Sequence, residues 1–245
     1  MRLRGWMTTM LMITMRRIFN GILNLIYPNL CEICGRKLAP GEEVMCLHCS
    51  YELPRTNAHR SSFNVVHERL VGTTPVELGA SWFFYYRSSP YVAMIHRGKY
   101  NGHPELLRIL ARKYARELQR DGFFDGIDLI VGVPLHPLKL MMRGYNKTDY
   151  IVKGLNDITG IKTGKNLKAA RYRKTQTRKG VFSRWLNSQG DYKVKNPADL
   201  EGKHILVVDD VLTTGSTLLT CCNAIHEAAP TARISVLTLA VTKLG

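Results

Sequence analysis

The sequence predicts an α/β domain with a mostly parallel sheet and helices on both faces, preceded by a small module built on four cysteines. Over residues 80–245, short apolar runs suited to buried strands alternate with longer amphipathic runs suited to helices. Two C-x-x-C pairs lie upstream, within residues 28–54. Residues 55–79 are polar with little periodicity, which indicates a linker. With 245 residues and 45% hydrophobic content, the chain can form one sizeable core and a small appendage.

The first half of the α/β region contains four expected elements. Ser81–Tyr86 is an aromatic strand, expected at a sheet edge, and Tyr91–Lys99 favours a short helix. Pro104–Arg120 predicts a longer helix, because Pro and Glu occupy its first turn and apolar residues recur at helical spacing. Ile127–Val133 is a short apolar run that favours a buried strand.

The second half continues the same alternation. Thr148–Ile158 predicts a helix, and Ile205–Val208 predicts a central strand. A helix is expected from about residue 217 to residue 229, because Pro230 cannot continue it. Arg233–Val241 is the last expected strand.

Two carboxylates and a hydroxyl-rich turn follow the central strand. Asp209 and Asp210 stand at its carboxyl end, where open α/β sheets bind ligands. The next turn would direct backbone N–H groups, hydroxyls and a helix N-terminus at one point, an arrangement that suits a phosphate. Its residues are Thr213, Thr214, Gly215, Ser216 and Thr217. We therefore expect a ribose 5-phosphate site, in which the carboxylates accept hydrogen bonds from sugar hydroxyls or order the hydration shell of Mg²⁺. The alternative is an ordinary strand-to-helix turn with polar caps.

The segment VVDDVLTTGST closely resembles the phosphoribosyl pyrophosphate (PRPP) motif of type I phosphoribosyltransferases. The resemblance implies the type I phosphoribosyltransferase fold and a Mg²⁺-PRPP ligand. It also implies that Asp209 and Asp210 bind the ribose and that residues 213–217 bind the 5-phosphate.

The loop after Ile127–Val133 is similar to the ComF subgroup of this superfamily, through Val133-Pro134-Leu135-His136 and Arg143-Gly144-Tyr145-Asn146. The resemblance implies diphosphate or second-substrate roles for Pro134, His136, Arg143, Gly144 and Asn146, and a catalytic role for Arg143 beside Asp209 and Asp210. The alternatives are a structural turn residue for His136 and a solvated surface charge for Arg143. Lys147 stands where ComF-like sequences usually carry Gln, which adds a positive charge near the expected diphosphate.

A basic segment lies farther along the chain. Residues 158–190 contain no Asp or Glu, and nine Lys or Arg. The part from Arg171 to Asn187 resembles the ComF family, and in type I transferases a mobile loop of this kind closes over the substrates. Two other interpretations stay open: a surface for single-stranded nucleic acid, with Tyr172 and Trp185 available for stacking, and a solvated basic face.

The cysteine spacing is Cys31-x2-Cys34-x11-Cys46-x2-Cys49, which is typical of a Cys₄ zinc ribbon with a structural Zn²⁺. A module of this size buries too little apolar surface to fold alone, so the metal would supply folding energy. An iron–sulfur or redox site is the alternative. ComF-type proteins also carry an N-terminal zinc ribbon. Cys221 and Cys222 fall in the last expected helix, where packing explains them.

Charge and cysteine usage limit the partners and the compartment. The net charge of +16 favours polyanions: nucleic acid, an anionic membrane or phosphorylated small molecules. Thiols spaced for a metal indicate a reducing compartment, so a cytoplasmic protein is expected. Residues 1–27 favour a short amphipathic segment, and their apolar run is too short to span a bilayer. A start at Met15, which would make the first 14 residues non-native, and a secretory signal are the alternatives.

Two functions follow. The ComF resemblance implies a phosphoribosyltransferase, in the glycosyltransferase class, linked to competence and DNA uptake. Its acceptor is not legible in the sequence. The alternative is a non-catalytic single-stranded DNA-binding protein on the same scaffold, working with DNA-uptake proteins.

Overall fold

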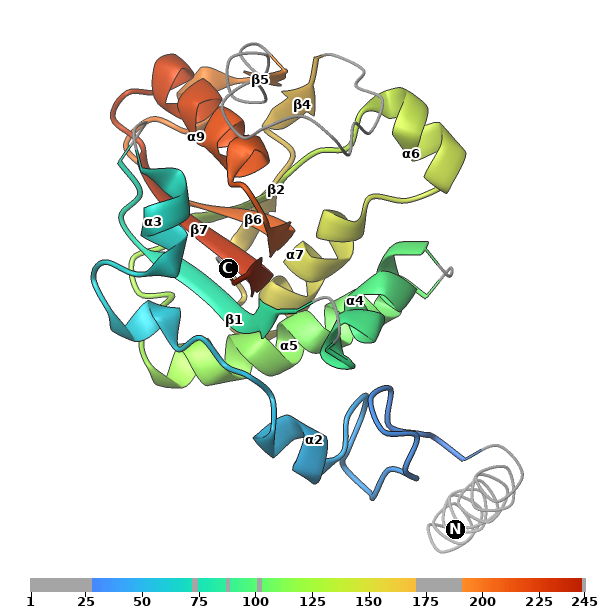
Figure 1. Cartoon of the computed structure of the whole chain (residues 1–245). Coiled ribbons are helices and arrows are strands. Elements are labelled where there is room, and N and C mark those ends of the chain that lie inside the picture. Colours follow the sequence, from blue (N-terminus) through green and yellow to red (C-terminus); the bar gives the residue numbers. More distant parts are fainter. Residues whose placement is uncertain (1–27, 72–74, 87–88, 101–102, 171–190, 244–245) are drawn as a thin grey trace, which may run out of the picture. The chain divides into compact units, whose positions relative to one another are not determined.

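The computed structural model describes residues 28–71, 75–86, 89–100, 103–170 and 191–243 (Figure 1). The chain forms two compact units, Met1–Glu52 and Leu53–Gly245. The amphipathic segment expected at residues 1–27 and most of the basic segment, residues 171–190, lie outside the described residues. Within the described residues, none of the helices has both the length and the apolar character needed to cross a bilayer.

Short-range contacts organise the first unit. A β-bridge joins Leu30 and Lys37, and helix α2 spans Leu47–Tyr51. The Glu42 carboxylate accepts hydrogen bonds from the backbone N–H groups of Ala39 and Leu47, each at 2.6 Å. Glu42 thus joins the segment after the first cysteine pair to Leu47, which lies inside the second pair.

The second unit is built on a five-stranded sheet in the order β1-β7-β6-β2-β3, and every neighbouring pair is parallel. The strands are β1 (Gly79–Tyr85), β2 (Leu129–Gly132), β3 (Lys162–Gly164), β6 (His204–Leu212) and β7 (Arg233–Thr242). The aromatic strand β1 lies at an edge and β6 at the centre, as the sequence predicts.

Helices cover both faces of this sheet (Figure 1). Helices α3 (Val65–Leu70) and α9 (Ser216–Ala228) lie on one face, and α4 (Tyr91–Tyr100), α5 (Glu105–Arg120) and α7 (Lys147–Thr159) lie on the other. The remaining helical elements are α6 (Pro137–Arg143) and the 3₁₀ turns η1 (Ala58–Arg60) and η2 (Pro197–Asp199). The predicted α/β fold is confirmed.

The apolar strands are buried on both faces, which explains why their sequences are continuously hydrophobic rather than alternating. In β6, Ile205 and Val207 join the core on the α9 side, together with Leu218 and Ile225 of α9. Leu206 and Val208 point to the opposite face because successive strand residues alternate, and they are fully buried as well.

Strands β4 (Leu167–Ala169) and β5 (Tyr192–Val194) form a separate two-stranded antiparallel sheet. The Ala170 N–H donates to the Asp191 carbonyl at 2.6 Å, which extends the pairing by one step. Ala170 and Asp191, the described residues on either side of residues 171–190, are therefore neighbours.

The stretch expected as a linker, residues 55–79, holds η1 and α3. Ala58, Val66 and Leu70 from this stretch are buried in the main core. Asn64 begins α3 by accepting from the Val66 N–H at 2.9 Å. Three apolar residues therefore anchor this segment to the core, although its overall composition is polar.

The connections after β2 and β6 diverge. After β2 the chain passes through α6 and α7 to β3, and after β6 it passes through α9 to β7. Because β2 and β6 are neighbours and their connections run in opposite directions, their carboxyl ends form a topological switch point. Open α/β sheets bind ligands at such points.

Candidate functional site

The loop after β2 begins directly beside the acidic pair. The Val133 N–H donates to the Val208 carbonyl at 2.9 Å, one residue before Asp209. The two sequence segments expected to form the site are therefore adjacent at the carboxyl edge of the sheet.

Asp209 and Asp210 lie inside β6, which continues to Leu212 rather than ending before them. Asp209 is 8% exposed and Asp210 is 1% exposed. Each carboxylate accepts from the next backbone N–H, Asp209 from Asp210 at 2.8 Å and Asp210 from Val211 at 2.8 Å. These bonds fix two negative groups in the sheet, and such burial requires a compensating cation or ligand.

Lys147, the first residue of α7, supplies such a cation. Its Nζ lies 2.6 Å from Asp210 Oδ1 and 3.8 Å from Asp209 Oδ1. Burial lowers the pKa of Lys147, but the two carboxylates outweigh it and the pKa is raised. Burial also raises the pKa of Asp209 to about 6, with Lys147 opposing and Asp210 adding to the rise.

The turn after β6 has the geometry of an anion cradle. Gly215 takes a left-handed φ of 79° at the cap position of α9, where it has no side chain to cap the helix. The Leu219 N–H donates to the Gly215 carbonyl at 2.9 Å, and this is the first hydrogen bond of the helix. Thr214 Oγ1 and Ser216 Oγ lie 3.2 Å apart beside this helix start. First-turn amides and neighbouring hydroxyls of this kind bind phosphate.

Helix α3 supports that turn from behind. A Cβ on Gly215 would lie 2.5 Å from the carbonyl oxygen of Arg69, so the two backbones are in close contact. The Arg69 guanidinium donates to the Thr213 carbonyl and, at 3.1 Å, to Thr242 Oγ1. Arg69 thus joins the phosphate turn to the end of β7. Sequence analysis missed this residue because no local pattern signals a contact with so distant a segment.

The loop after β2 is held by its own side chains. Asn146 Nδ2 and Thr148 Oγ1 both donate to the Val133 carbonyl, at 3.1 Å and 2.7 Å. Gly132 packs closely here, since a Cβ would lie 3.2 Å from Thr148 Oγ1. Asn146 is buried and has a structural contact with Val133, whereas the ligand role expected for it stays a prediction.

Helix α6 interrupts what the sequence suggests is a loop. His136 caps it, because its Nδ1 accepts from the Leu138 N–H at 3.3 Å, and Pro137 occupies the first turn. Gly144 ends it with a φ of 80° and an N–H donated to the Leu140 carbonyl at 2.7 Å. The cap corresponds to the structural interpretation of His136. Pro134 lies just before this helix and is partly exposed.

Three cations gather at this end of the sheet. The pKa of Lys139 is lowered by burial, and next by the neighbouring charges of Arg143 and Lys147. Arg143 is therefore part of a cluster rather than an isolated surface charge. Lys139 was not predicted as a site residue, although its spacing of four from Arg143 places both on one helix face.

The donors fit the groups that the fold implies. Two carboxylates offer the oxygen atoms that Mg²⁺ prefers, while Lys147 already offsets part of their charge. Backbone amides and hydroxyls at the start of α9 fit a phosphate dianion. The site can hold a sugar phosphate by its hydroxyls at one end and its phosphate at the other.

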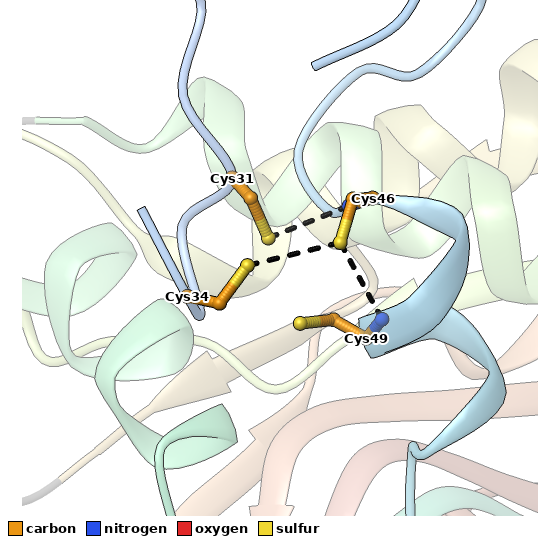
Figure 2. A group of neighbouring side chains, drawn as sticks. All are labelled: Cys31, Cys34, Cys46 and Cys49. Carbon is orange, nitrogen blue, oxygen red and sulfur yellow. Dashed lines mark hydrogen bonds between the residues drawn. The ribbon is translucent and has the colours of Figure 1, made fainter. Parts of the chain in front are cut away.

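A second candidate site lies in the first unit, where Cys31, Cys34, Cys46 and Cys49 converge (Figure 2). Their sulfur atoms all lie within 4.8 Å of one another, and the Sγ atoms of Cys34 and Cys46 are 3.8 Å apart. A tetrahedral zinc with Zn–S bonds of about 2.3 Å requires S···S distances of about 3.8 Å.

Backbone amides support these sulfurs. Cys31 Sγ accepts from the Cys46 N–H at 3.4 Å, and Cys46 Sγ accepts from the Cys49 N–H at 3.5 Å. Burial raises the pKa of Cys31, but hydrogen bonds from the backbone N–H groups of Cys34, Cys46 and Ile33 outweigh it and lower the pKa to about 7. The cluster therefore fits a thiolate-bound zinc ion. His48 is exposed and lies outside the four-cysteine group.

The family model described as "Phosphoribosyl transferase domain" matches residues 97–243, more than half of the chain. The chain belongs to the phosphoribosyl transferase domain family. The match spans the acidic pair, the phosphate turn and the loop after β2, so every residue expected in the ribose-phosphate and diphosphate sites falls within the matched range.

Curated relatives match over a longer range. "DNA utilization protein YhgH" of Escherichia coli (strain K12) is 26% identical over 205 residues, covering 79% of this chain and 89% of the relative. The protein of the same name from Salmonella typhimurium is 25% identical over 204 residues, with the same coverage. The ComF-type assignment made from the sequence is confirmed.

Solved structures match more distantly. The "allosteric regulatory enzyme of purine biosynthesis" and the glutamine PRPP amidotransferase from B. subtilis each give a TM-score of 0.40 at 18% identity. Each match covers 59% of this chain and only 30% of the solved chain.

Proposed function

We propose that this phosphoribosyl transferase domain binds a ribose 5-phosphate group, as Mg²⁺-PRPP or a related ligand. The observation that best supports this proposal is that a buried acidic pair and a glycine-capped helix start lie together at the switch point of a parallel sheet. Phosphate and sugar hydroxyls need these two kinds of partner, and the spacing along one strand and turn suits one sugar.

Each part of the site has a separate task in the proposal. The first-turn amides of α9, with the side chains of Thr213, Thr214, Ser216 and Thr217, bind the 5-phosphate. Asp209 and Asp210 accept hydrogen bonds from the ribose 2′- and 3′-hydroxyls. Asp209 and Asp210 would also hold the hydration shell of a bound Mg²⁺, which would supply positive charge to the diphosphate.

The loop after β2 faces the diphosphate in this proposal. Lys139 and Arg143 carry the charge that would stabilise a departing diphosphate, with Pro134, His136, Gly144 and Asn146 shaping the loop around it. Transfer to an acceptor would then be a phosphoribosyltransferase reaction, in which positioning and charge stabilisation do most of the work.

Ligand-induced stabilisation tests the binding proposal. The melting temperature of the native protein should rise with saturating Mg²⁺-PRPP or ribose 5-phosphate, because a ligand that binds only the folded state stabilises it. The double variant Asp209→Asn/Asp210→Asn should lose the rise. Asp199→Asn, an exposed carboxylate in η2, is the matched control and should keep it. No shift in the native protein would reject the ligand assignment.

For the cysteine cluster we propose a structural Zn²⁺. The closed set of four thiol ligands leaves no open position for substrate, as in structural rather than catalytic sites. Four thiols arranged for a metal ion suit a reducing compartment, and we propose a cytoplasmic location on this ground.

A second candidate function is binding of single-stranded DNA, in partnership with DNA-uptake proteins. Two observations favour it: the curated relatives are named DNA utilization proteins, and the net charge is +16. The test measures single-stranded DNA affinity against salt for the native protein and for a variant neutralised at Arg171, Arg173, Lys174, Arg178 and Lys179. An unchanged salt slope would remove the basic segment from the proposal.

A further inference from the structure

The ammonium group of Lys147 lies against the two carboxylates that the proposed function assigns to ribose. We propose that Lys147 is a resident cation of this acidic pair, which weakens divalent-metal binding there and makes ligand binding less dependent on Mg²⁺. The inference rests on the proposed function for its ligand, but its effect on metal binding is measurable without any ligand.

The contact is short and enclosed. Lys147 Nζ lies 2.6 Å from Asp210 Oδ1, and the Asp210 side chain is only 2% exposed. Lys147 itself has a side chain that is 21% exposed, far less than a typical surface lysine. An ion pair shielded in this way is screened little by salt, and loss of one partner leaves an uncompensated charge.

Helix propensity does not account for a lysine at this position. Lys147 is the first residue of α7, where the helix dipole disfavours a positive charge. The residues on either side, Asn146 and Thr148, are both bonded to the Val133 carbonyl, which fixes the backbone from which Lys147 extends. The acidic pair is the interaction that compensates for the unfavourable helix position.

The surrounding charges reinforce the effect. The pKa of Lys139 is lowered by burial and then by the charges of Arg143 and Lys147, and the charge of Arg143 also opposes the raised pKa of Lys147, so the three cations are close enough to repel one another. Against them stand Asp209 and Asp210. Lys147 is paired with both carboxylates, and Lys139 and Arg143 add positive charge beside Lys147, so the site favours anions over free divalent cations.

A divalent ion would therefore compete with Lys147 for Asp210. Mg²⁺ binds oxygen at about 2.0–2.1 Å and gives up its water reluctantly, so a carboxylate already neutralised by an ammonium group is a poor ligand for it. Lys147 already supplies part of the positive charge that a metal would provide to an incoming phosphorylated sugar.

Direct metal binding tests the inference in the absence of ligand. Mn²⁺ is titrated into the protein and free Mn²⁺ is measured by electron paramagnetic resonance, with the zinc site saturated beforehand. Lys147→Gln should bind Mn²⁺ at least about tenfold more tightly than the native protein, because one nearby positive charge is gone. The added binding should disappear when Asp209→Asn/Asp210→Asn is combined with it.

Matched variants control for charge and for folding. Lys153→Gln makes the same change at an exposed position of α7 and should leave Mn²⁺ affinity unchanged. Lys147→Arg keeps the charge and should behave like the native protein, whereas Lys147→Met keeps an apolar stem and should match Lys147→Gln. If both neutral variants fail to fold, the native protein decides: tight Mn²⁺ binding that Asp209→Asn/Asp210→Asn abolishes would overturn the inference.

A second experiment, with ribose 5-phosphate added, distinguishes this inference from the proposed function. The thermal shift caused by ribose 5-phosphate should be nearly equal with and without added Mg²⁺ for the native protein, and clearly larger with Mg²⁺ for Lys147→Gln. No shift of the native protein in either condition rejects the proposed ligand, while the Mn²⁺ comparison still stands. Unchanged Mn²⁺ affinity in Lys147→Gln rejects the resident cation, whatever the ligand does.

Discussion

Replacing Gly215 by Ala adds one methyl group at the point where the phosphate turn rests on α3. The new Cβ would lie 2.5 Å from the Arg69 carbonyl oxygen and 3.2 Å from Leu70 Cδ2. The left-handed φ of 79° costs a non-glycine residue about 1–2 kcal/mol. The clash adds about 1–3 kcal/mol, because a backbone carbonyl in a helix cannot rotate away. We therefore expect Gly215→Ala to lower the free energy of unfolding by about 2–5 kcal/mol.

Gly202→Ala provides the matched control. Gly202 has a similar φ of 68°, but its added Cβ would meet no atom within 4 Å. This variant should show the backbone cost alone, about 1–2 kcal/mol. Urea unfolding followed by tryptophan fluorescence measures both, since Trp82 is buried in the same unit. If Gly215→Ala is no less stable than Gly202→Ala, the close contact between the turn and α3 is refuted.

Two further predictions concern the cysteines and the acidic pair. Cys34→Ser should lower the zinc content measured by atomic absorption from about one ion per chain, because one of four ligands is lost, whereas Cys222→Ala should keep it. Full zinc retention by Cys34→Ser would contradict the site. Burial raises the pKa of Asp209 from 3.8 to about 6. The protonated carboxyl therefore favours the folded state, an effect that is fully present below pH 3.8 and is lost as the pH rises through 6. In EDTA, Asp209→Asn should thus gain stability relative to the native protein from about pH 4 to about pH 7 in urea unfolding, and a constant difference would contradict the shift.

The parts of the fold that the sequence predicted are those governed by local patterns. The apolar run Ile205–Val208 predicted β6, and the apolar spacing over Pro104–Arg120 predicted α5. Gly215 followed by hydroxyl residues marked the turn into α9. Periodicity and turn chemistry act over a few residues, so a single sequence displays them directly.

Contacts between distant segments were not predictable in this way. The pairing of Lys147 with Asp210 depends on β2 and β6 becoming neighbours, which no spacing rule specifies. Arg69 reaches the phosphate turn from a stretch whose polar composition hides α3. Helix α6 had local signals, Pro137 at its start and Gly144 at its end, but none of its residues is buried, so hydrophobic periodicity gave no sign of it.

The edge strand β1 has a practical consequence for anyone trimming the chain to the span of its family match. That span begins at residue 97, downstream of β1 (Gly79–Tyr85) and α3. A fragment starting there would leave β7 with an open row of N–H and C=O groups along residues 236–242, where it now pairs with β1, and residues 236–241 are apolar apart from Thr238. Unprotected strands of this kind recruit further copies edge to edge and precipitate. Recombinant versions of the phosphoribosyl transferase domain should therefore begin near Leu53 to remain monodisperse.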